Sequence, residues 1–238
     1  MNAFLLVLHV LLMGCAYKPI TPAKAKTEHS ESIASMRKSP YHILALGDSY
    51  TIGESVEHSE RWPTQLVQLL RNDNVAIDEP TTIAKTGWTT DELMQAIEKE
   101  NPQDTFDLVS LLIGVNNQYR GRSEDEYRHE FKVLLQRSIT FAGGKPSHVI
   151  VLSIPDWGVT PFAEGRDKVK IAHEIDGFNA INQEEAVRAG VQYVDVTEIS
   201  RQSVHDPSLI AADGLHPSAK MYAYWARLVH PVALKVLR

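Results

Sequence analysis

The stretch that decides the fold is His42-Ile-Leu-Ala-Leu46, a short apolar run that stops at Gly47-Asp48-Ser49. An apolar run of this length, bounded by turn residues, is typical of a strand buried inside a sheet. Four further runs of this kind follow along the chain, at 81–84, 108–113, 148–152 and 192–196. The sequence therefore predicts five strands.

Between these runs lie segments with apolar residues at helical spacing. They are expected as helices at 61–71, 90–99, 123–141, 168–189 and 218–237. Thr89 or Thr90 is a suitable N-cap for the second helix, and Ser123 and Glu126 have the spacing of a capping box at the third. Pro231 can kink or divide the last helix. Strands that alternate with helices predict an α/β fold, a flavodoxin-like three-layer α/β/α arrangement with a five-stranded parallel sheet.

The overall composition excludes several classes of protein. The chain has 238 residues, with 24 Lys and Arg against 30 Asp and Glu, which gives a formal net charge of −6. A nucleic-acid-binding protein would need a basic face to meet phosphates, so no nucleic-acid partner is expected. Hydrophobic residues make up 43% and charged residues 23%, which excludes disorder for most of the chain. The single cysteine excludes an intrachain disulfide framework and a zinc site built on cysteines.

The N-terminal segment has the features of an export signal. Residues 3–13 are apolar except for His9, and this run is too short to span a bilayer, which takes about 20 apolar residues. It fits the core of a signal peptide. The run ends in Leu12-Met13-Gly14-Cys15, which resembles the bacterial lipoprotein signal, where cleavage precedes a cysteine that is then lipidated. The alternative is an ordinary secretory signal, or a poorly ordered terminus with a free thiol.

These features divide the chain into three expected parts. Residues 1–14 would be the signal peptide, and residues 15–39 a flexible tether, because this stretch holds Pro19, Pro22 and few large apolar groups. Residues 40–238 would form one α/β domain. The protein is thus expected in a bacterial cell envelope, lipid-anchored or secreted and periplasmic, with membrane contact only through a lipid on Cys15.

Polar clusters follow the predicted strands at the positions where functional residues belong. In a parallel sheet, ligands bind in the crevice beyond the carboxyl ends of the strands. Four clusters, far apart in sequence, would meet at this edge: Gly47-Asp48-Ser49-Tyr50-Thr51, Gly87-Trp88-Thr89-Thr90, Gly114-Val115-Asn116-Asn117 and Asp213-Gly214-Leu215-His216-Pro217. We therefore expect one site assembled from all four.

The clusters resemble the four blocks of the SGNH or GDSL hydrolase family, which supply a Ser, a Gly, an Asn and a His. The matching residues are Ser49, Gly87, Asn116 and His216, in the family's order and over nearly all of residues 40–238. Tyr50 stands where the family name has Leu, and Asn117 stands where Asp is common. The resemblance implies the SGNH hydrolase fold and a serine esterase or acylhydrolase without metal or cofactor.

The same residues can be given roles from their chemistry. A serine hydroxyl is a weak nucleophile until a base takes its proton, and His216 is the candidate base for Ser49. Asp213, three residues before His216, can hold the imidazole in one tautomer if the segment turns. The three would act as nucleophile, general base and orienting carboxylate. Pro217 suits the first turn of the last helix, which would put His216 near the helix N-terminus, where the dipole disfavours imidazolium.

The attacked carbonyl becomes an oxyanion, and donors must already point at it. The expected donors are the backbone N–H groups of Ser49 and Gly87 and the side-chain amide of Asn116. Glycine at position 87 tolerates positive φ and lets the backbone approach the substrate. The Asn116 amide donates without titrating.

Each motif alone has a plainer explanation. Ser49 could cap the segment after a strand, Gly87 could be a turn glycine, and Asn116 could be a loop cap. Asp48 is expected to bond backbone groups of its turn. The Asp-x-x-His pair could supply two metal ligands, but no third ligand stands out, so no metal site is expected.

The sequence leaves two functions open. The first is a serine esterase that cleaves small-molecule, lipid or sugar O-acyl esters through an acyl-serine intermediate. The second is a non-catalytic envelope lipoprotein that binds glycan or lipid on the same scaffold. Nucleotide binding is disfavoured because Gly47-Asp-Ser does not match Gly-x-Gly-x-x-Gly. Trp157, after the fourth strand, could line the substrate pocket or pack in the core.

Overall fold

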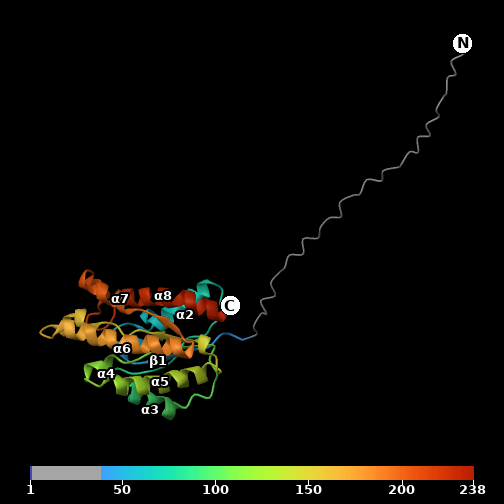
Figure 1. The fold of residues 1–238 in the computed structure, drawn as a ribbon. Helices are drawn as coiled ribbons and strands as arrows, with labels where there is room; N and C mark the ends of the chain where they lie inside the picture. Colours follow the sequence, from blue (N-terminus) through green and yellow to red (C-terminus); the bar gives the residue numbers. More distant parts are fainter. Residues whose placement is uncertain (2–38) are drawn as a thin grey trace. The chain divides into compact units, whose positions relative to one another are not determined.

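The computed structural model describes Met1 and residues 39–238 of the chain (Figure 1). The expected signal peptide at 1–14, apart from Met1, lies outside the described residues, as do Cys15 and all of the expected tether except Ser39. Within the described part, no helix is both long and apolar enough to cross a membrane.

A parallel sheet runs through the centre of the fold (Figure 1). Its strands are β1 (Ile43–Gly47), β2 (Thr81–Ala84), β3 (Leu108–Leu112), β4 (Val149–Leu152) and β5 (Gln192–Val194). They lie in the order β2-β1-β3-β4-β5, and every neighbouring pair is parallel. The predicted five-stranded parallel sheet is confirmed, and strand ends differ from the expected ones by at most two residues.

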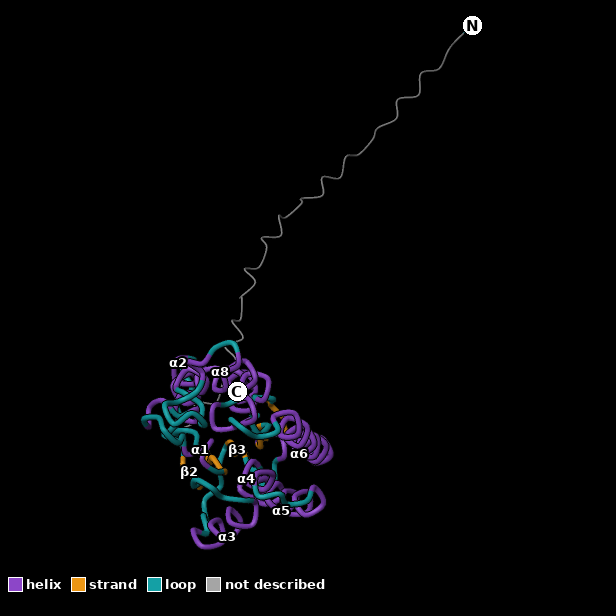
Figure 2. Tube along the Cα trace, turned by 90° about the vertical axis from the view of Figure 1, so that its left-hand side faces the viewer, coloured by secondary structure: helices purple, strands orange, loops and turns teal. Residues whose placement is uncertain are grey.

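Long helices cover both faces of this sheet, as Figure 1 and Figure 2 show from two sides. On one face, α2 (Trp62–Asn72) and α8 (Ala219–Leu237) pack against each other. The other face carries α3 (Thr90–Glu100), α5 (Glu124–Phe141) and α6 (Lys168–Ala189). The three-layer α/β/α fold is therefore as predicted, with apolar side chains of both helix layers buried against the sheet.

Three short helices begin close to where strands end. They are α1 (Ser49–Ile52) after β1, α4 (Val115–Tyr119) after β3, and α7 (Thr197–Arg201) after β5. The sequence predicts none of the three, because a helix of one turn is too short to show an apolar period. All three lie at the carboxyl edge of the sheet.

Two of the expected helix caps are present. Thr89, rather than Thr90, is the N-cap of α3, where its side chain and that of Glu92 form a reciprocal capping box. Ser123 accepts a hydrogen bond from the Glu126 N–H at 3.2 Å at the start of α5. Each side chain satisfies a backbone donor that the first helical turn leaves without a partner.

The start of α8 corrects one expectation. Ser218 is its N-cap and accepts from the Met221 N–H, so Pro217 precedes the cap and does not occupy the first turn. Pro217 instead forms an antiparallel bridge with Ile210, which fixes the segment before the helix. Pro231 lies inside α8, and the helix runs through it without dividing.

The register of the sheet determines where a site can form. Gly47, the last residue of β1, pairs with Ala84 of β2 on one side and Leu112 of β3 on the other. The carboxyl ends of these three strands therefore lie side by side. The strand order also reverses at β1, and a crevice for ligands forms at such a switch point.

Candidate active site

A small cavity opens at this edge of the sheet, with a volume of about 170 Å³. Its lining residues are Ser49, Tyr50, Thr86, Gly87, Val115, Asn116, Tyr119, Trp157, Phe162, Leu215 and His216. The structure thus brings the predicted Ser, Gly, Asn and His from four distant segments to one cavity.

Ser49 is the first residue of α1 and follows β1 with only Asp48 between them. Asp48 is the N-cap, since its Oδ1 accepts from the Tyr50 N–H at 3.0 Å. A Cβ at position 47 would collide with the Thr51 side chain and the Leu112 carbonyl, so the tight turn requires Gly47. The explanation of Ser49 as the cap of this turn is therefore wrong, and its hydroxyl has no capping bond.

Asp48 is fully buried, and this burial raises its pKa to about 7 against the opposing effect of the Tyr50 backbone hydrogen bond. Its Oδ2 is buried without a hydrogen-bond partner. Burying an ionised carboxylate with one oxygen that lacks a hydrogen-bond partner is unfavourable, whereas the neutral acid avoids burying a charge. The structural role expected for Asp48 is confirmed by its contact with the turn backbone.

Asp213 and His216 form a closely bonded pair. His216 Nδ1 lies 2.6 Å from Asp213 Oδ2, while Asp213 Oδ1 accepts from the N–H groups of Leu215 at 2.9 Å and His216 at 3.0 Å. The Ser55 hydroxyl also donates to Asp213 Oδ2, at 2.6 Å. Partial burial raises the pKa of Asp213, but these four donors outweigh it and hold the pKa well below its usual range.

This arrangement fixes which imidazole nitrogen can act as a base. Because Asp213 stays ionised, it can only accept a hydrogen bond, so His216 Nδ1 carries the proton and donates that bond to Asp213. The lone pair of the neutral imidazole is then on Nε2. The His216 ring is held from the other side by Tyr50, with ring centroids 5.4 Å apart.

Ser49 and His216 line the same cavity but are not joined by a hydrogen bond in residues 39–238. The Ser49 side chain has no protein hydrogen bond in this part of the chain, so its hydroxyl is unrestrained by other partners. Catalytic hydrogen bonds are often long in a site without substrate and tighten when substrate is bound. The alignment of nucleophile and base therefore stays a prediction.

The expected oxyanion donors lie around the same cavity. Gly87 has φ of +86°, which requires the freedom of glycine, and its carbonyl accepts from Arg120 at 2.7 Å. Neither the Ser49 N–H nor the Gly87 N–H donates to another group within residues 39–238. The Asn116 Nδ2 donates to the Trp88 carbonyl at 2.9 Å, and its second hydrogen remains free for a ligand.

Asn117 couples two of the four segments. Its side chain is fully buried, accepts from the Thr90 N–H at 3.1 Å and donates to the Thr90 Oγ1 at 2.6 Å. Thr90 begins α3, three residues after Gly87, whereas Asn117 follows Asn116 directly. These two bonds therefore fix the distance between the two segments that carry expected oxyanion donors.

Aromatic rings form the apolar wall of the cavity. Tyr119 meets Trp157 edge-on, with centroids 5.4 Å apart, and Trp157 meets Phe162 in the same way at 5.9 Å. Trp157 is almost fully buried and its Nε1 donates to Gln118 at 2.7 Å, so it both packs in the core and lines the pocket. The Arg166 guanidinium lies over all three rings, at 5.2 to 5.5 Å from their centroids.

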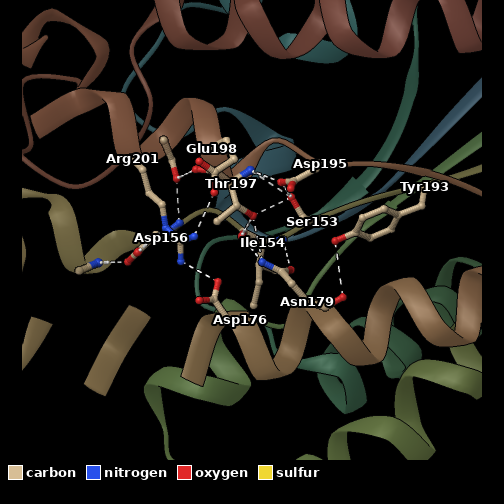
Figure 3. A network of polar contacts seen from close by, with 12 residues as sticks. Ser153, Ile154, Asp156, Asp176, Asn179, Tyr193, Asp195, Thr197, Glu198 and Arg201 are labelled. Atoms are coloured by element: carbon tan, nitrogen blue, oxygen red, sulfur yellow. Dashed lines mark hydrogen bonds and ion pairs between the residues drawn. The ribbon is translucent and has the colours of Figure 1, made fainter. Parts of the chain in front are cut away.

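A polar network holds the segment that leads into this wall (Figure 3). Asn179 of α6 accepts from the Ile154 N–H at 2.8 Å and donates to its carbonyl at 2.9 Å. Arg201 at the end of α7 binds the buried Asp156 at 3.1 Å and Asp176 of α6 at 2.6 Å. The connection after β4 is thereby fixed to two helices just before Trp157.

Three residues of the site had no signal in the sequence. Tyr119 and Phe162 are exposed aromatic residues that line the cavity from the end of α4 and from the connection between β4 and α6. Ser55 meets Asp213 from 158 positions away. Residues 39–238 contain no group of three or more His, Cys, Asp or Glu side chains placed to hold a metal ion.

The fold and the residues around its cavity define a flavodoxin-like α/β protein with a serine at the carboxyl edge of its parallel sheet. The sequence matches the GDSL-like Lipase/Acylhydrolase family over residues 45–224, and the chain belongs to this family. Ester hydrolysis is the general activity that this membership supports.

Several solved structures share the fold. A structure of TesA aligns with a TM-score of 0.64 at 17% identity, covering 82% of this chain and 99% of TesA. Axe2, an acetylxylan esterase from Geobacillus stearothermophilus, aligns with a TM-score of 0.62 at 18% identity, covering 84% and 94% of the two chains. The psychrotrophic esterase EstA from Pseudoalteromonas sp. aligns with a TM-score of 0.57 at 15% identity, over 82% and 93%. The sequence has no significant match among curated proteins.

Proposed function

We propose that this protein is a serine esterase with Ser49 as nucleophile, His216 as general base and Asp213 as the orienting carboxylate. The observation that carries the proposal is the Asp213–His216 pair at 2.6 Å, whose imidazole lines the same small cavity as Ser49, Gly87 and Asn116. Family membership supports the reaction class, and the geometry supports the assignment of roles.

The reaction would proceed in two halves. The Ser49 oxygen bonds to the ester carbonyl carbon while His216 Nε2 takes the hydroxyl proton, and the carbonyl electrons move onto oxygen. The N–H groups of Ser49 and Gly87 and the Asn116 amide stabilise this oxyanion. The carbonyl then re-forms, the alcohol leaves with the proton from His216, and an acyl-serine remains. Water repeats these steps, releases the carboxylic acid and restores Ser49.

The size of the cavity points to short acyl groups. Its 170 Å³ is well below the roughly 300–1,000 Å³ of pockets that enclose drug-sized ligands. A short acyl chain fits against the rings of Tyr119, Trp157 and Phe162, while the larger alcohol, from a lipid or a sugar, extends outside. Small-molecule, lipid and sugar O-acyl esters with short acyl groups are therefore the proposed substrates.

Hydrolysis of p-nitrophenyl acetate by wild type and Ser49→Ala tests the proposal. The variant should lose turnover while its circular dichroism spectrum and Tm stay close to wild type, and labelling by a fluorophosphonate should disappear with it. Ser123→Ala, which removes a helix cap outside the cavity, should keep both activity and labelling. Turnover by Ser49→Ala at the wild-type rate would contradict the assignment.

The second candidate is a non-catalytic glycan- or lipid-binding protein on the same scaffold. The observation in its favour is that no hydrogen bond joins Ser49 to His216 in residues 39–238. A panel of short-chain esters separates the two candidates, since a binder would be silent across the whole panel and would not react with a fluorophosphonate.

We also propose export to a bacterial cell envelope, with a lipid on Cys15 as the only membrane contact. The apolar run at 3–13 and the Leu12-Met13-Gly14-Cys15 stretch support this. Expression in a bacterium with a palmitate analogue, followed by membrane fractionation, provides the test. Wild type should be labelled and membrane-bound, whereas Cys15→Ser should be unlabelled. A label on both proteins, or on neither, would contradict lipidation at Cys15.

A further inference from the structure

Ser55 makes a contact that joins two distant parts of the site. Its hydroxyl donates to Asp213 Oδ2 at 2.6 Å, the same oxygen that accepts from His216 Nδ1 at 2.6 Å. Ser55 lies six residues after Ser49, whereas Asp213 lies on the segment before α8. One short bond therefore connects the segment that follows the nucleophile to the carboxylate beside the base.

The backbone at Ser55 is in an unusual conformation for its residue type. Its φ is +67°, in the left-handed region that residues other than glycine, asparagine and aspartate adopt rarely. The preceding turn is held by bonds from the N–H groups of Gly53 and Glu54 to the Ser49 carbonyl, both at 3.0 Å. A glycine would adopt this conformation without strain but would have no hydroxyl. Strain of this kind persists where the surrounding structure enforces it, and it is concentrated at functional sites.

We propose that Ser55 is a positioning residue that holds Asp213 and, through it, sets the orientation and proton affinity of His216; this rests on the proposed function above. The physical reason is competition for one oxygen. With Ser55 present, Asp213 Oδ2 shares its negative charge between two donors, which moderates its pull on the imidazole proton. Without the hydroxyl, Oδ2 keeps the bond with His216 Nδ1 but loses its second donor, so the carboxylate stabilises imidazolium more strongly and is held less firmly at that oxygen.

Other titratable groups face the Asp213–His216 pair, and their effects on the pH profile must be distinguished from the effect of Ser55. Tyr50 packs on the His216 ring, and the further groups are Asp48 beside α1, Glu54 in the same turn as Ser55, and Tyr222 on α8. Burial raises the pKa of Asp48 to about 7, so this carboxyl is expected to titrate in the range of an esterase assay. The comparison of Ser55 variants is therefore repeated with Asp48→Asn as the parent protein.

Three substitutions distinguish the hydroxyl from the backbone strain. Ser55→Gly removes both, Ser55→Ala removes only the hydroxyl, and Ser55→Thr keeps the hydroxyl while its branched side chain increases the strain. Among the three variants, Ser55→Gly should thus be the most stable, Ser55→Ala less stable and Ser55→Thr the least stable. If the hydroxyl matters for the reaction, activity should follow a different order, with Thr closest to wild type.

The test is to measure both kcat and kcat/KM for p-nitrophenyl acetate across pH in these variants. Ser55→Gly and Ser55→Ala should lose about tenfold in kcat, the effect of one hydrogen bond to a charged group, and their acid limbs should move to higher pH by several tenths of a unit. Ser55→Thr should keep the wild-type acid limb despite a lower Tm. Ser123→Ala should lower Tm and leave the profile in place, as a destabilising control.

Two results would overturn the inference and can be told apart. Profiles of Ser55→Gly and Ser55→Ala that superimpose on wild type, or that track Tm across all variants, would show that Ser55 has only a structural role. A wild type that hydrolyses no ester and resists the fluorophosphonate would refute the proposed function and this inference together.

Discussion

Asp48 and Asp213 both lie close enough to Tyr50 for their charges to raise its pKa. The surroundings of the two carboxyls nevertheless shift their own pKa values in opposite directions. Asp48 is fully buried, and this desolvation raises its pKa to about 7 against the opposing effect of backbone hydrogen bonds. Asp213 is partly buried, but four donors hold its pKa well below the usual range. Carboxyls whose environments separate their pKa values often divide the roles of a site between them. Here the negative charge is concentrated on Asp213, beside His216.

The raised pKa of Asp48 predicts a measurable effect on stability. The folded protein binds the Asp48 proton more tightly than the unfolded chain, so the stability from this group is complete below the unfolded pKa and is lost as pH rises through about 7. In Asp48→Asn the side chain at this position is a neutral amide that does not titrate in this range. Between about pH 5 and pH 8, urea denaturation should show wild type losing on the order of 3 kcal/mol more than the variant.

The control for this measurement is Asp125→Asn, which changes an exposed carboxyl on α5. It should lose stability with pH as wild type does. If Asp48→Asn also follows the wild-type curve, Asp48 is ionised in the folded protein at neutral pH and its burial is offset by contacts that the structure does not contain.

Asn116 provides a second prediction for a single residue. If its free amide hydrogen stabilises the oxyanion, Asn116→Ala should lower kcat about 100-fold with little change in KM, because the bond forms only in the transition state. Its neighbour Asn117 is the matched control, since Asn117→Ala loses two buried bonds to Thr90 and should lower Tm more than Asn116→Ala does. Equal kcat for Asn116→Ala and wild type would remove Asn116 from the oxyanion site.

At the scale of elements, periodic segments were predictable from the sequence and single turns were not. The runs around Leu44, Val109 and Val151 are buried on both sides, so their composition alone marks them as strands. The Asp213–His216 contact spans three residues, which makes it a local matter that sequence can suggest. Ser55 reaches Asp213 only through the conformation of a distant turn, and no local pattern encodes that contact.

The connection between β4 and α6 supplies part of the cavity wall. We therefore predict that its side chains determine which acyl-chain lengths the protein accepts. Phe162 lies on this connection, is 43% exposed and contacts the Trp157 ring edge-on. Phe162→Ala should open the cavity outward, so the ratio of kcat/KM for p-nitrophenyl butyrate to that for the acetate should rise about tenfold. Val133 is a similarly exposed apolar residue on α5, and Val133→Ala should leave the ratio unchanged. A constant ratio in Phe162→Ala would mean that the acyl chain lies elsewhere.

At the scale of the whole molecule, the site depends on how layers are joined at one edge of the sheet. β1, β2 and β3 end in register, so the segments of Ser49, Gly87 and Asn116 start from a common plane. His216 comes from the segment that enters α8, and Trp157 comes from the connection after β4. The geometry of the cavity therefore reflects contacts between layers, and damage to such a contact should affect both stability and substrate binding.

Arg201 tests this dependence, because it joins α7 to the segment before Trp157 and to α6. Asp156 is only 1% exposed, so Arg201→Met should leave a buried carboxylate without its ion pair and cost about 3 kcal/mol in the free energy of unfolding. The double variant Arg201→Met with Asp156→Asn removes that charge and should recover part of the loss. In both variants KM for p-nitrophenyl acetate should rise while kcat changes less, since the wall moves and the Asp213–His216 pair does not. Additive losses in the double variant, with KM unchanged, would show that Arg201 stabilises the fold without positioning the cavity wall.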